Sequence, residues 1–375
     1  MSKVLGVGII GCGNISTTYF RLGPLFKGFE IIACADLSDE AAQARAEEYG
    51  VRKESIDGLL GADDIDLIIN LTIPDAHFSV TKQILEAGKH AYSEKPLVLS
   101  LEQGHELAKI SADKSLSIGC APDTFLGSSH QLARQKIDNG DIGKITSGTC
   151  HVMSHGMEKW HPNPDFFFLP GGGPIFDLGP YYIANLINLV GPIKRVAALS
   201  SMATDTRTIG SEARKGETIP VKTPTNIHAL LEFENGATIT FSASWDVWSH
   251  RHKNMELYGT EGSIFVPDPN FFGGDVLMAG SDGEIMTLDI WDHPFAINNY
   301  KDDTQANYRT AGLADMAVAI LEGRDARCSF DRALHGVDVM ASILKSGETG
   351  EFVDITTKCT RPAALGIDEA RALLK

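Results

Sequence analysis

The chain has 375 residues, 43% of them hydrophobic and 22% charged, which is the composition of a globular protein with room for two domains. Its 33 basic and 49 acidic residues give a formal charge of -16, which argues against nucleic acid or an anionic membrane as a partner held by a general electrostatic surface. No apolar run reaches the roughly 18 residues of a membrane-spanning helix, and the start of the chain lacks the charged region and cleavage site of a signal peptide. We therefore expect a cytoplasmic protein.

The first 36 residues predict one strand–turn–helix–strand unit. Residues 4–10 are apolar and β-branched, and the glycine turn Gly11-Cys12-Gly13-Asn14-Ile15-Ser16 follows at once. Apolar residues then recur at helical spacing over residues 17–26, and a second strand runs over residues 29–36. This order favours a dinucleotide site, because a pyrophosphate binds backbone N–H groups at a helix N-terminus, where the helix dipole favours negative charge.

Individual residues of this unit have separate expected roles in cofactor binding. Gly11 would allow the tight turn, and Gly13 would leave room for the pyrophosphate. Asp36 would accept hydrogen bonds from the adenosine ribose, and because a 2′-phosphate would meet this carboxylate, we predict NAD rather than NADP. Ser16 replaces the third small residue of the G-x-G-x-x-G/A pattern, and serine is small enough for helix–strand packing. The alternative interpretation is a structural turn that binds nothing.

The chain as far as residue 120 continues to alternate strands with helices. This alternation predicts a parallel, doubly wound α/β sheet of the Rossmann type, with ligands at the carboxyl ends of the strands. We place a domain boundary after residue 122, giving an NAD-binding domain over residues 1–122. The expected helices cover residues 38–49, 78–87 and 101–114, and the expected strands cover residues 66–72, 90–93 and 116–120.

Residues 123–375 predict an α+β domain for substrate binding and oligomerisation, built on a mostly antiparallel open sheet. Short turns such as Glu234-Asn235-Gly236 favour antiparallel pairing, and residues 267–308 are expected to form a long loop with short strands. A sheet with one uncovered apolar face must bury it, so we predict a homodimer or homotetramer. The expected strands cover residues 144–152, 196–202, 226–234, 237–243, 254–258, 263–266 and 352–355, and the expected helices cover residues 127–139, 311–322 and 331–348.

Three further clusters contain residues that could carry chemistry: Glu94-Lys95-Pro96, Ala121-Pro122-Asp123, and the stretch from Trp160-His161-Pro162 through Gly171-Gly172-Gly173 to Asp177, Gly179 and Tyr181. With the glycine turn, these motifs resemble the Gfo/Idh/MocA oxidoreductases, a family named for glucose-fructose oxidoreductase and inositol dehydrogenase, over nearly the whole chain. The resemblance implies an NAD-dependent enzyme that oxidises a secondary or anomeric hydroxyl of a sugar, sugar derivative or cyclitol by hydride transfer.

The resemblance also implies roles for single residues. Lys95 would lie beside the nicotinamide and hydrogen-bond the reacting hydroxyl, with Glu94 as a cofactor or structural partner and Pro96 in a cis peptide. Asp177 would orient the substrate. The family's histidine four residues later is Tyr181 here, which leaves the base to Lys95 or to a Lys95–Tyr181 pair. His161 is a further alternative, because it could reach the substrate pocket and replace the absent imidazole. We expect Lys95 to be the base, with Tyr181 and Asp177 holding the substrate; the alternative for Tyr181 is packing in the core.

Further candidate site residues are predicted only from their positions in the sequence. Asp123, Trp160 and His161 are expected to bind substrate, although His161 could equally be an exposed loop residue and Trp160 a core residue. Thr72, Pro74 and His77 fall where the family lines the nicotinamide and phosphate region, and their alternative is a strand end followed by a helix cap. His151 and His155 have no third ligand at metal spacing, so no metal site is expected.

Two other functions fit the same motifs. Some relatives use NAD transiently to cleave a glycosidic bond by oxidation, elimination and reduction, and others have become non-catalytic NAD-sensing regulators. Intact Lys95 and Asp177 argue against the regulator. Residues 356–375 carry no pattern with a functional interpretation.

Overall fold

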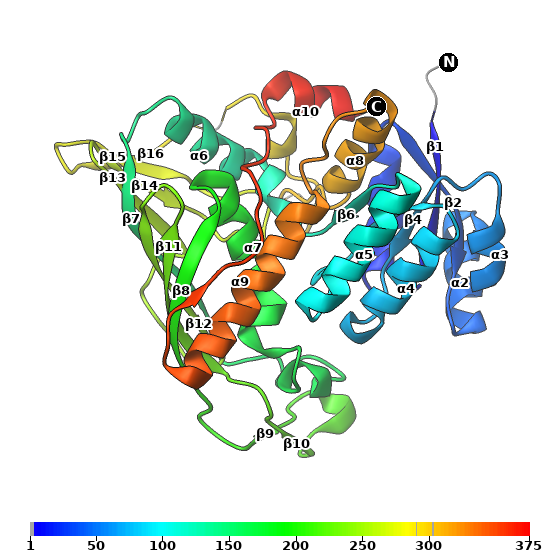
Figure 1. Cartoon of the computed structure of the whole chain (residues 1–375), viewed down its shortest axis with the longest axis horizontal. Coiled ribbons are helices and arrows are strands. Elements are labelled where there is room, and N and C mark those ends of the chain that lie inside the picture. Colours follow the sequence, from blue (N-terminus) through cyan, green and yellow to red (C-terminus); the bar gives the residue numbers. More distant parts are fainter. Residues whose placement is uncertain (1–3, 290, 302–303) are drawn as a thin grey trace.

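The computed structural model of the protein describes residues 4–289, 291–301 and 304–375. A parallel sheet forms the centre of the first domain (Figure 1). Its six strands lie in the order β3-β2-β1-β4-β5-β6, and all neighbouring pairs are parallel. The change of direction in strand order between β1 and β4 leaves a crevice at the carboxyl ends, so the predicted doubly wound sheet is confirmed. The strands are β1 (Leu5–Ile10), β2 (Phe29–Ala35), β3 (Arg52–Lys53), β4 (Leu67–Asn70), β5 (His90–Ser93) and β6 (Ile118–Cys120).

Helices connect these strands and begin and end at recognisable caps. The Ser38 side chain accepts from the Ala41 N–H at the start of α2, and Gly50 ends that helix in the left-handed conformation. The helix expected over residues 17–26 is shorter, because Gly23 and Pro24 begin a 3₁₀ turn, η1 (Gly23–Leu25). The helices are α1 (Ser16–Leu22), α2 (Asp39–Tyr49), α3 (Ile56–Gly61), α4 (Pro74–Glu86) and α5 (Leu101–Lys114).

A nine-stranded sheet in the order β16-β15-β14-β13-β7-β12-β11-β8-β17 forms the second half. All its pairs are antiparallel except β7 with β12, which confirms the mostly antiparallel prediction. The strands are β7 (Ile145–Met153), β8 (Ile193–Ser201), β11 (Asn226–Phe233), β12 (Thr238–Ser244), β13 (Met255–Gly259), β14 (Ser263–Val266), β15 (Leu277–Ala279), β16 (Ile285–Thr287) and β17 (Val353–Asp354).

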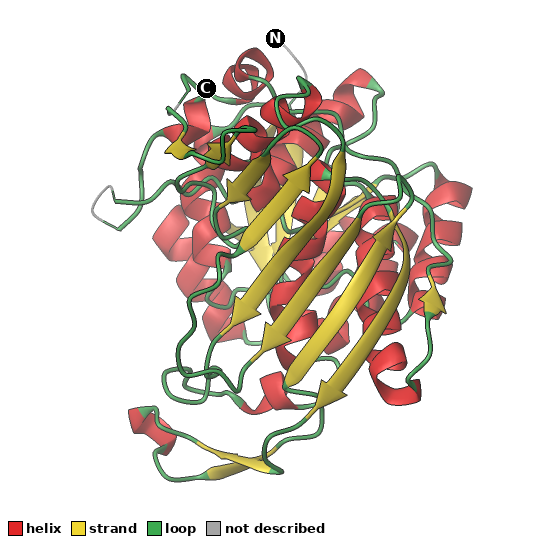
Figure 2. Cartoon of the chain, turned by 90° about the vertical axis from the view of Figure 1, so that its left-hand side faces the viewer, coloured by secondary structure: helices red, strands yellow, loops and turns green. Residues whose placement is uncertain are grey.

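The second sheet is covered on one face only. Helices α6 (Ser128–Asp138), α7 (Gly173–Leu189) and α9 (Phe330–Thr349) pack on the face toward the first domain, while no helix of the described residues covers the opposite face (Figures 1 and 2). Along β11, Ile227, Ala229 and Leu231 are buried under these helices, while Leu230 points to the open face and is 53% exposed. A separate hairpin of β9 (Thr206–Thr208) and β10 (Thr218–Pro220) projects from one end of the sheet.

The chain returns to the first domain at its end. Helix α8 (Ala311–Glu322) and helix α10 (Ile367–Leu373) contribute side chains to the same buried cluster as β1 and β2. The N–H of Lys27 donates to the carbonyl of Leu373 at 2.8 Å, and the N–H of Lys375 donates to Leu25 at 2.9 Å. Residues 356–375 therefore strap the second domain to the first.

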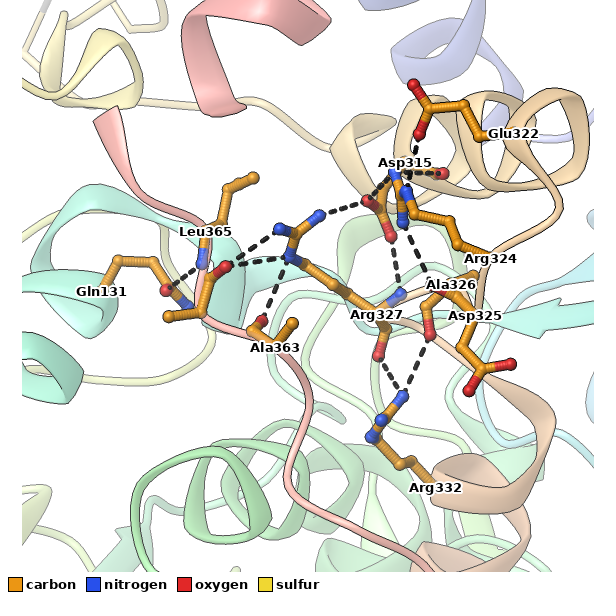
Figure 3. A network of polar contacts seen from close by, with 11 residues as sticks. Gln131, Asp315, Glu322, Arg324, Asp325, Ala326, Arg327, Arg332, Ala363 and Leu365 are labelled. Carbon is orange, nitrogen blue, oxygen red and sulfur yellow. Dashed lines mark hydrogen bonds and ion pairs between the residues drawn. The ribbon is translucent and has the colours of Figure 1, made fainter. Parts of the chain in front are cut away.

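A buried ion-pair network fixes this strap (Figure 3). Asp315, fully buried on α8, accepts from the guanidinium groups of Arg327 at 2.5 Å and Arg324 at 2.9 Å. Arg327 then donates to the carbonyls of Ala363 at 3.1 Å and Ala364 at 2.9 Å in the strap. The network thus joins α8 to a segment far along the chain.

Across the three described ranges, no helix combines the length and apolar character that crossing a membrane requires. The same ranges hold no group of three or more His, Cys, Asp or Glu side chains arranged for a metal ion.

Candidate functional site

A cavity of about 460 Å³ lies at the carboxyl ends of the parallel strands, between the two domains. Four segments line it: the glycine turn after β1, the end of β4, the turn after β5, and residues 166–181 at the start of α7. Arg309, just before α8, completes the wall. The carboxyl ends of the parallel strands and the start of helix α7 therefore face one another across this cavity.

The glycine turn has the shape that a pyrophosphate requires. Gly11 has φ +103°, and a Cβ there would stand 2.6 Å from the Leu71 carbonyl oxygen, so a side chain is excluded on two grounds. A Cβ on Gly13 would meet nothing within 4 Å, because that position faces open space. Among the described residues, no acceptor is hydrogen-bonded to the backbone N–H groups of Gly13, Asn14 and Ile15. These free donors at the start of α1 fit a dinucleotide phosphate.

Asp36 lies beside this turn at the end of β2. Its carboxylate accepts from the N–H of Cys12 at 2.6 Å and from the N–H of Ser38 at 2.8 Å. These bonds fix the carboxylate next to the glycine turn, at the position where the sequence predicts the adenosine ribose.

The end of β4 is held to the turn after β5 by a buried histidine. The ring nitrogens of His77 lie 2.6 Å from the Pro96 carbonyl and 3.0 Å from the Thr72 carbonyl. Burial lowers the pKa of His77. Buried Asn70, which the sequence did not single out, donates to the His77 carbonyl and accepts from the Thr72 hydroxyl. Thr72, Pro74 and His77 all line the cavity, and His77 also has a clear structural function.

Lys95 meets Asp177 inside the cavity. The Lys95 Nζ donates to the Asp177 carboxylate at 2.9 Å and to the Asp177 backbone carbonyl at 2.8 Å. Burial lowers the pKa of Lys95, but its neighbours Asp177, Tyr181 and Glu94 together outweigh this effect and raise the pKa above its ordinary value. The side chain is therefore an ammonium at neutral pH. The Lys95–Pro96 peptide is cis, as expected.

Glu94 supports the Lys95 turn. Its carboxylate accepts from the Tyr19 hydroxyl at 3.0 Å and from the Lys95 backbone N–H at 3.1 Å. Both Glu94 and Lys95 line the cavity. Glu94 therefore fixes the backbone that carries the ammonium.

Helix α7 brings Asp177 and Tyr181 to one wall, because residues four apart lie on the same helix face. The glycines before it allow the chain to turn closely: a Cβ on Gly172 would stand 2.6 Å from the Phe167 carbonyl oxygen. Tyr181 is 5% exposed and lines the cavity, and the Lys95 Nζ lies 5.2 Å from its ring centroid. The tyrosine thus packs in the core and faces the cavity at the same time.

Arg309 is a site residue that no sequence pattern singled out. Its guanidinium donates to the Tyr181 hydroxyl oxygen at 3.0 Å and to the backbone and side-chain oxygens of Asn270 at 3.1 and 3.0 Å. It lies at the end of the segment expected to be a long loop, where neither periodicity nor a motif marks it. Only the packing of that loop against α7 brings it to the cavity.

Asp123 lies behind the cavity wall. Its carboxylate, 4% exposed, accepts from the backbone N–H groups of Thr310 at 2.9 Å and Gly312 at 3.0 Å. Burial raises the pKa of Asp123. The side chain holds the start of α8, immediately after Arg309, and is absent from the cavity lining.

Trp160 and His161 also lie outside the cavity lining. Trp160 is 65% exposed, and the Nδ1 of His161 accepts from the Asn163 N–H at 3.1 Å. The His161 ring packs edge-on against Phe166 and Phe167, which do line the cavity. None of the three consecutive phenylalanines before the glycine triplet was predicted as a site residue, although their run is the one local signal for these wall residues.

Comparison with known proteins agrees with this geometry. Residues 5–120 match the family model described as "Oxidoreductase family, NAD-binding Rossmann fold", and residues 130–265 match "GFO/IDH/MocA C-terminal domain". The chain is 22% identical to 1,5-anhydro-D-fructose reductase of Ensifer adhaerens over 364 residues, 93% of this chain and 98% of that protein.

Two further similarities differ in extent. An uncharacterised oxidoreductase of Schizosaccharomyces pombe is 26% identical over 200 residues, 51% of this chain but only 53% of that protein. A structure of levoglucosan dehydrogenase in complex with NADH and levoglucosan superposes with a TM-score of 0.80 at 22% identity, covering 95% of this chain and all of that one. The family models together with the Rossmann sheet and the open second sheet lead to one conclusion: this chain belongs to the Gfo/Idh/MocA oxidoreductases.

Proposed function

We propose that the protein is an NAD-dependent dehydrogenase that interconverts a secondary or anomeric hydroxyl of a sugar, sugar derivative or cyclitol with the corresponding carbonyl. The observation that carries this proposal is the Lys95–Asp177 pair in a cavity next to the free amides of the glycine turn. The names of two similar proteins, 1,5-anhydro-D-fructose reductase and levoglucosan dehydrogenase, support a sugar as substrate.

The cavity residues have different roles in the proposed reaction. Gly13, Asn14 and Ile15 would hold the cofactor, whose nicotinamide when bound accepts or supplies the hydride. The Lys95 ammonium has three donors and gives two contacts to Asp177, so one donor is left for the reacting oxygen of the substrate. Because Lys95 stays protonated beside Asp177 and its other neighbours, we assign the proton transfer to Tyr181 rather than, as expected from the sequence, to Lys95. Asp177 orients the Lys95 ammonium.

Formation of NADH, followed by its absorbance, tests the function directly. The protein is incubated with NAD and a panel of aldoses, anhydrosugars, cyclitols and polyols, and in the reverse direction with NADH and keto-sugars. We expect turnover within one of these classes. Binding of NAD without turnover of any member would refute the proposal, and hydrolysis of a chromogenic glycoside without net NADH would favour glycoside cleavage instead.

Asp36 is expected to set the preference for NAD. The variant Asp36→Asn keeps an acceptor oxygen for the Cys12 N–H but removes the charge that repels a 2′-phosphate. A hydrogen bond to a charged group contributes about 1.5–3 kcal/mol, so we expect the ratio of the Kd values for NADP and NAD to fall at least about tenfold. Fluorescence titration with both cofactors measures this ratio; an unchanged ratio would mean that Asp36 does not face the ribose.

The open sheet face is expected to pair with a second copy of the chain. The strand register places Leu199 and Leu230 on this face, where they are 74% and 53% exposed, and exposed apolar side chains favour burial against a partner. Light scattering should give at least twice the 40.5 kDa chain mass. Leu230→Asp should reduce the mass to that of one chain, whereas Ile297→Asp, at an exposed position away from the sheet, should not. A wild-type monomer would contradict the prediction.

A further inference from the structure

The orientation of the Tyr181 O–H group is set by its hydrogen bond with Arg309. A guanidinium carries only N–H donors, so in the 3.0 Å contact the Tyr181 oxygen must accept from Arg309. The phenol's own proton is then turned away from Arg309. Among the described residues no acceptor is hydrogen-bonded to this proton, and the tyrosine lines the cavity, so the proton faces the space where a substrate would lie.

Arg309 is held in place by Asn270, by Tyr181 and by the backbone of the residue that follows it. The two Asn270 oxygens fix one end of the guanidinium, and the Tyr181 ring lies 5.3 Å from its central carbon. The next residue, Thr310, has φ +121°, a conformation that a β-branched residue rarely adopts. The buried Asp123 carboxylate keeps this backbone in place by accepting from the Thr310 N–H at 2.9 Å. Such a fixed cation is preorganised to act on Tyr181.

We propose that Arg309 is a positioning residue that directs the Tyr181 proton into the cavity, so that the Arg309–Tyr181 pair takes the place of the histidine that Tyr181 replaces in the family's motif. This inference rests on the proposed dehydrogenase function. It adds Arg309 as the residue that makes Tyr181 suitable for proton transfer. Asp123, expected to touch substrate, contributes indirectly by fixing the segment that carries Arg309.

The chemical step balances in the direction of carbonyl reduction. The Tyr181 O–H bond breaks and an O–H bond forms on the substrate oxygen, while the substrate carbon gains a hydride supplied by the reduced nicotinamide cofactor. The negative charge left on the Tyr181 oxygen lies against the Arg309 guanidinium, with the Lys95 ammonium 5.2 Å from the ring centroid. Oxidation of the alcohol reverses each transfer.

A double-mutant cycle on turnover tests the proposal in the full-length protein. Arg309→Met, Tyr181→Phe and the double variant are compared with wild type on the sugar found by the NADH assay. Loss of a proton-transfer group costs about 100- to 10,000-fold, so we expect Arg309→Met to lower kcat about 100-fold with little change in KM. In the Tyr181→Phe background the same change should cost less than about threefold, because residues that act as one unit are not additive.

The other results of the cycle would overturn the proposal. Losses that multiply would show that Arg309 acts apart from Tyr181, and a raised KM with unchanged kcat would make Arg309 a binding residue. If Arg309→Met fails to fold, Arg309→Lys keeps the charge but cannot reach Tyr181 and Asn270 together; we expect a kcat loss of roughly tenfold, and wild-type kcat would overturn the proposal. Arg21→Met removes an exposed arginine 5.1 Å from the Tyr300 ring and should leave kcat unchanged.

A second readout separates this inference from the dehydrogenase function. Fluorotyrosine incorporation gives one ¹⁹F resonance for each of the eight tyrosines, and Tyr181→Phe assigns that of Tyr181. Without any substrate, Arg309→Met should shift this resonance and Arg21→Met should not. An unmoved resonance would refute the positioning role even in an active enzyme, whereas a shifted resonance in a protein that turns over no sugar would refute the proposed function alone.

Discussion

Replacement of Lys95 by methionine is expected to abolish measurable turnover while leaving NAD bound. Methionine keeps the length of the side chain but removes the ammonium that lies 2.9 Å from the Asp177 carboxylate and has one donor left for the substrate oxygen. Loss of one preorganised donor at the reacting oxygen costs about 100- to 1,000-fold in kcat. The Asp177 carboxylate then also loses its partner, so the substrate loses two oriented contacts and the decrease should reach at least the upper end of that range.

Steady-state NADH formation and a fluorescence titration with NAD measure the two parts of this result. Lys82→Met is a suitable control, because Lys82 pairs with Glu106 on the surface of the same domain, away from the cavity. A Lys95→Met protein with more than about a tenth of wild-type kcat would exclude Lys95 from the reacting centre. Loss of NAD binding in this variant would instead make Lys95 primarily a cofactor ligand.

The cofactor half of the site was predictable because its signals are local. The continuous apolar run of residues 4–10 predicts β1, and the glycines that follow meet two backbone requirements: a positive φ at Gly11 and open space at Gly13. Asp36 follows β2 in the same unit, within 2.6 Å of the Cys12 N–H. Strand, turn, helix and acid lie within 36 consecutive residues, so no long-range packing had to be known.

The substrate half depends on contacts between distant segments, which a sequence pattern does not encode. From its position at the end of a parallel strand, Asp123 was expected to bind substrate. Its carboxylate instead accepts hydrogen bonds from backbone N–H groups nearly 190 residues later. Arg309 joins Tyr181 only because the segment before α8 folds back over α7. The helix α7 itself contains Pro180, an unfavourable residue inside a helix, which obscured its periodicity.

The C-terminal strap is a second feature that local signals missed. Residues 356–375 have little regular structure apart from α10, so no pattern marks them. Their position is set by polar partners elsewhere in the chain: Arg327 holds the carbonyls of Ala363 and Ala364, and the Gln131 side chain accepts from the Leu365 N–H at 2.7 Å. Figure 3 labels Gln131, Arg327, Ala363 and Leu365 among these partners.

The Asp315→Asn variant is therefore expected to destabilise the whole protein. Asp315 is fully buried and neutralises Arg327, which is only 8% exposed. Asparagine keeps the shape but leaves the Arg327 charge buried without a counter-charge, and breaking a buried pair in this way costs about 3–5 kcal/mol. Because Arg327 carries the strap, the loss should also release residues 363–375 from the first domain.

Urea denaturation followed by tryptophan fluorescence gives the change in the free energy of unfolding, and limited proteolysis reports release of the strap. Asp292→Asn is the matched control: Asp292 pairs with Arg371 on α10 at 3.2 Å but is 95% exposed, so its loss should cost less than about 1 kcal/mol. Equal effects of the two variants would show that burial does not strengthen the Asp315 pair. Destabilisation by Asp315→Asn with an uncleaved C-terminus would mean that α10 holds to the first domain through its apolar face alone, since Ala370 and Leu373 are buried there.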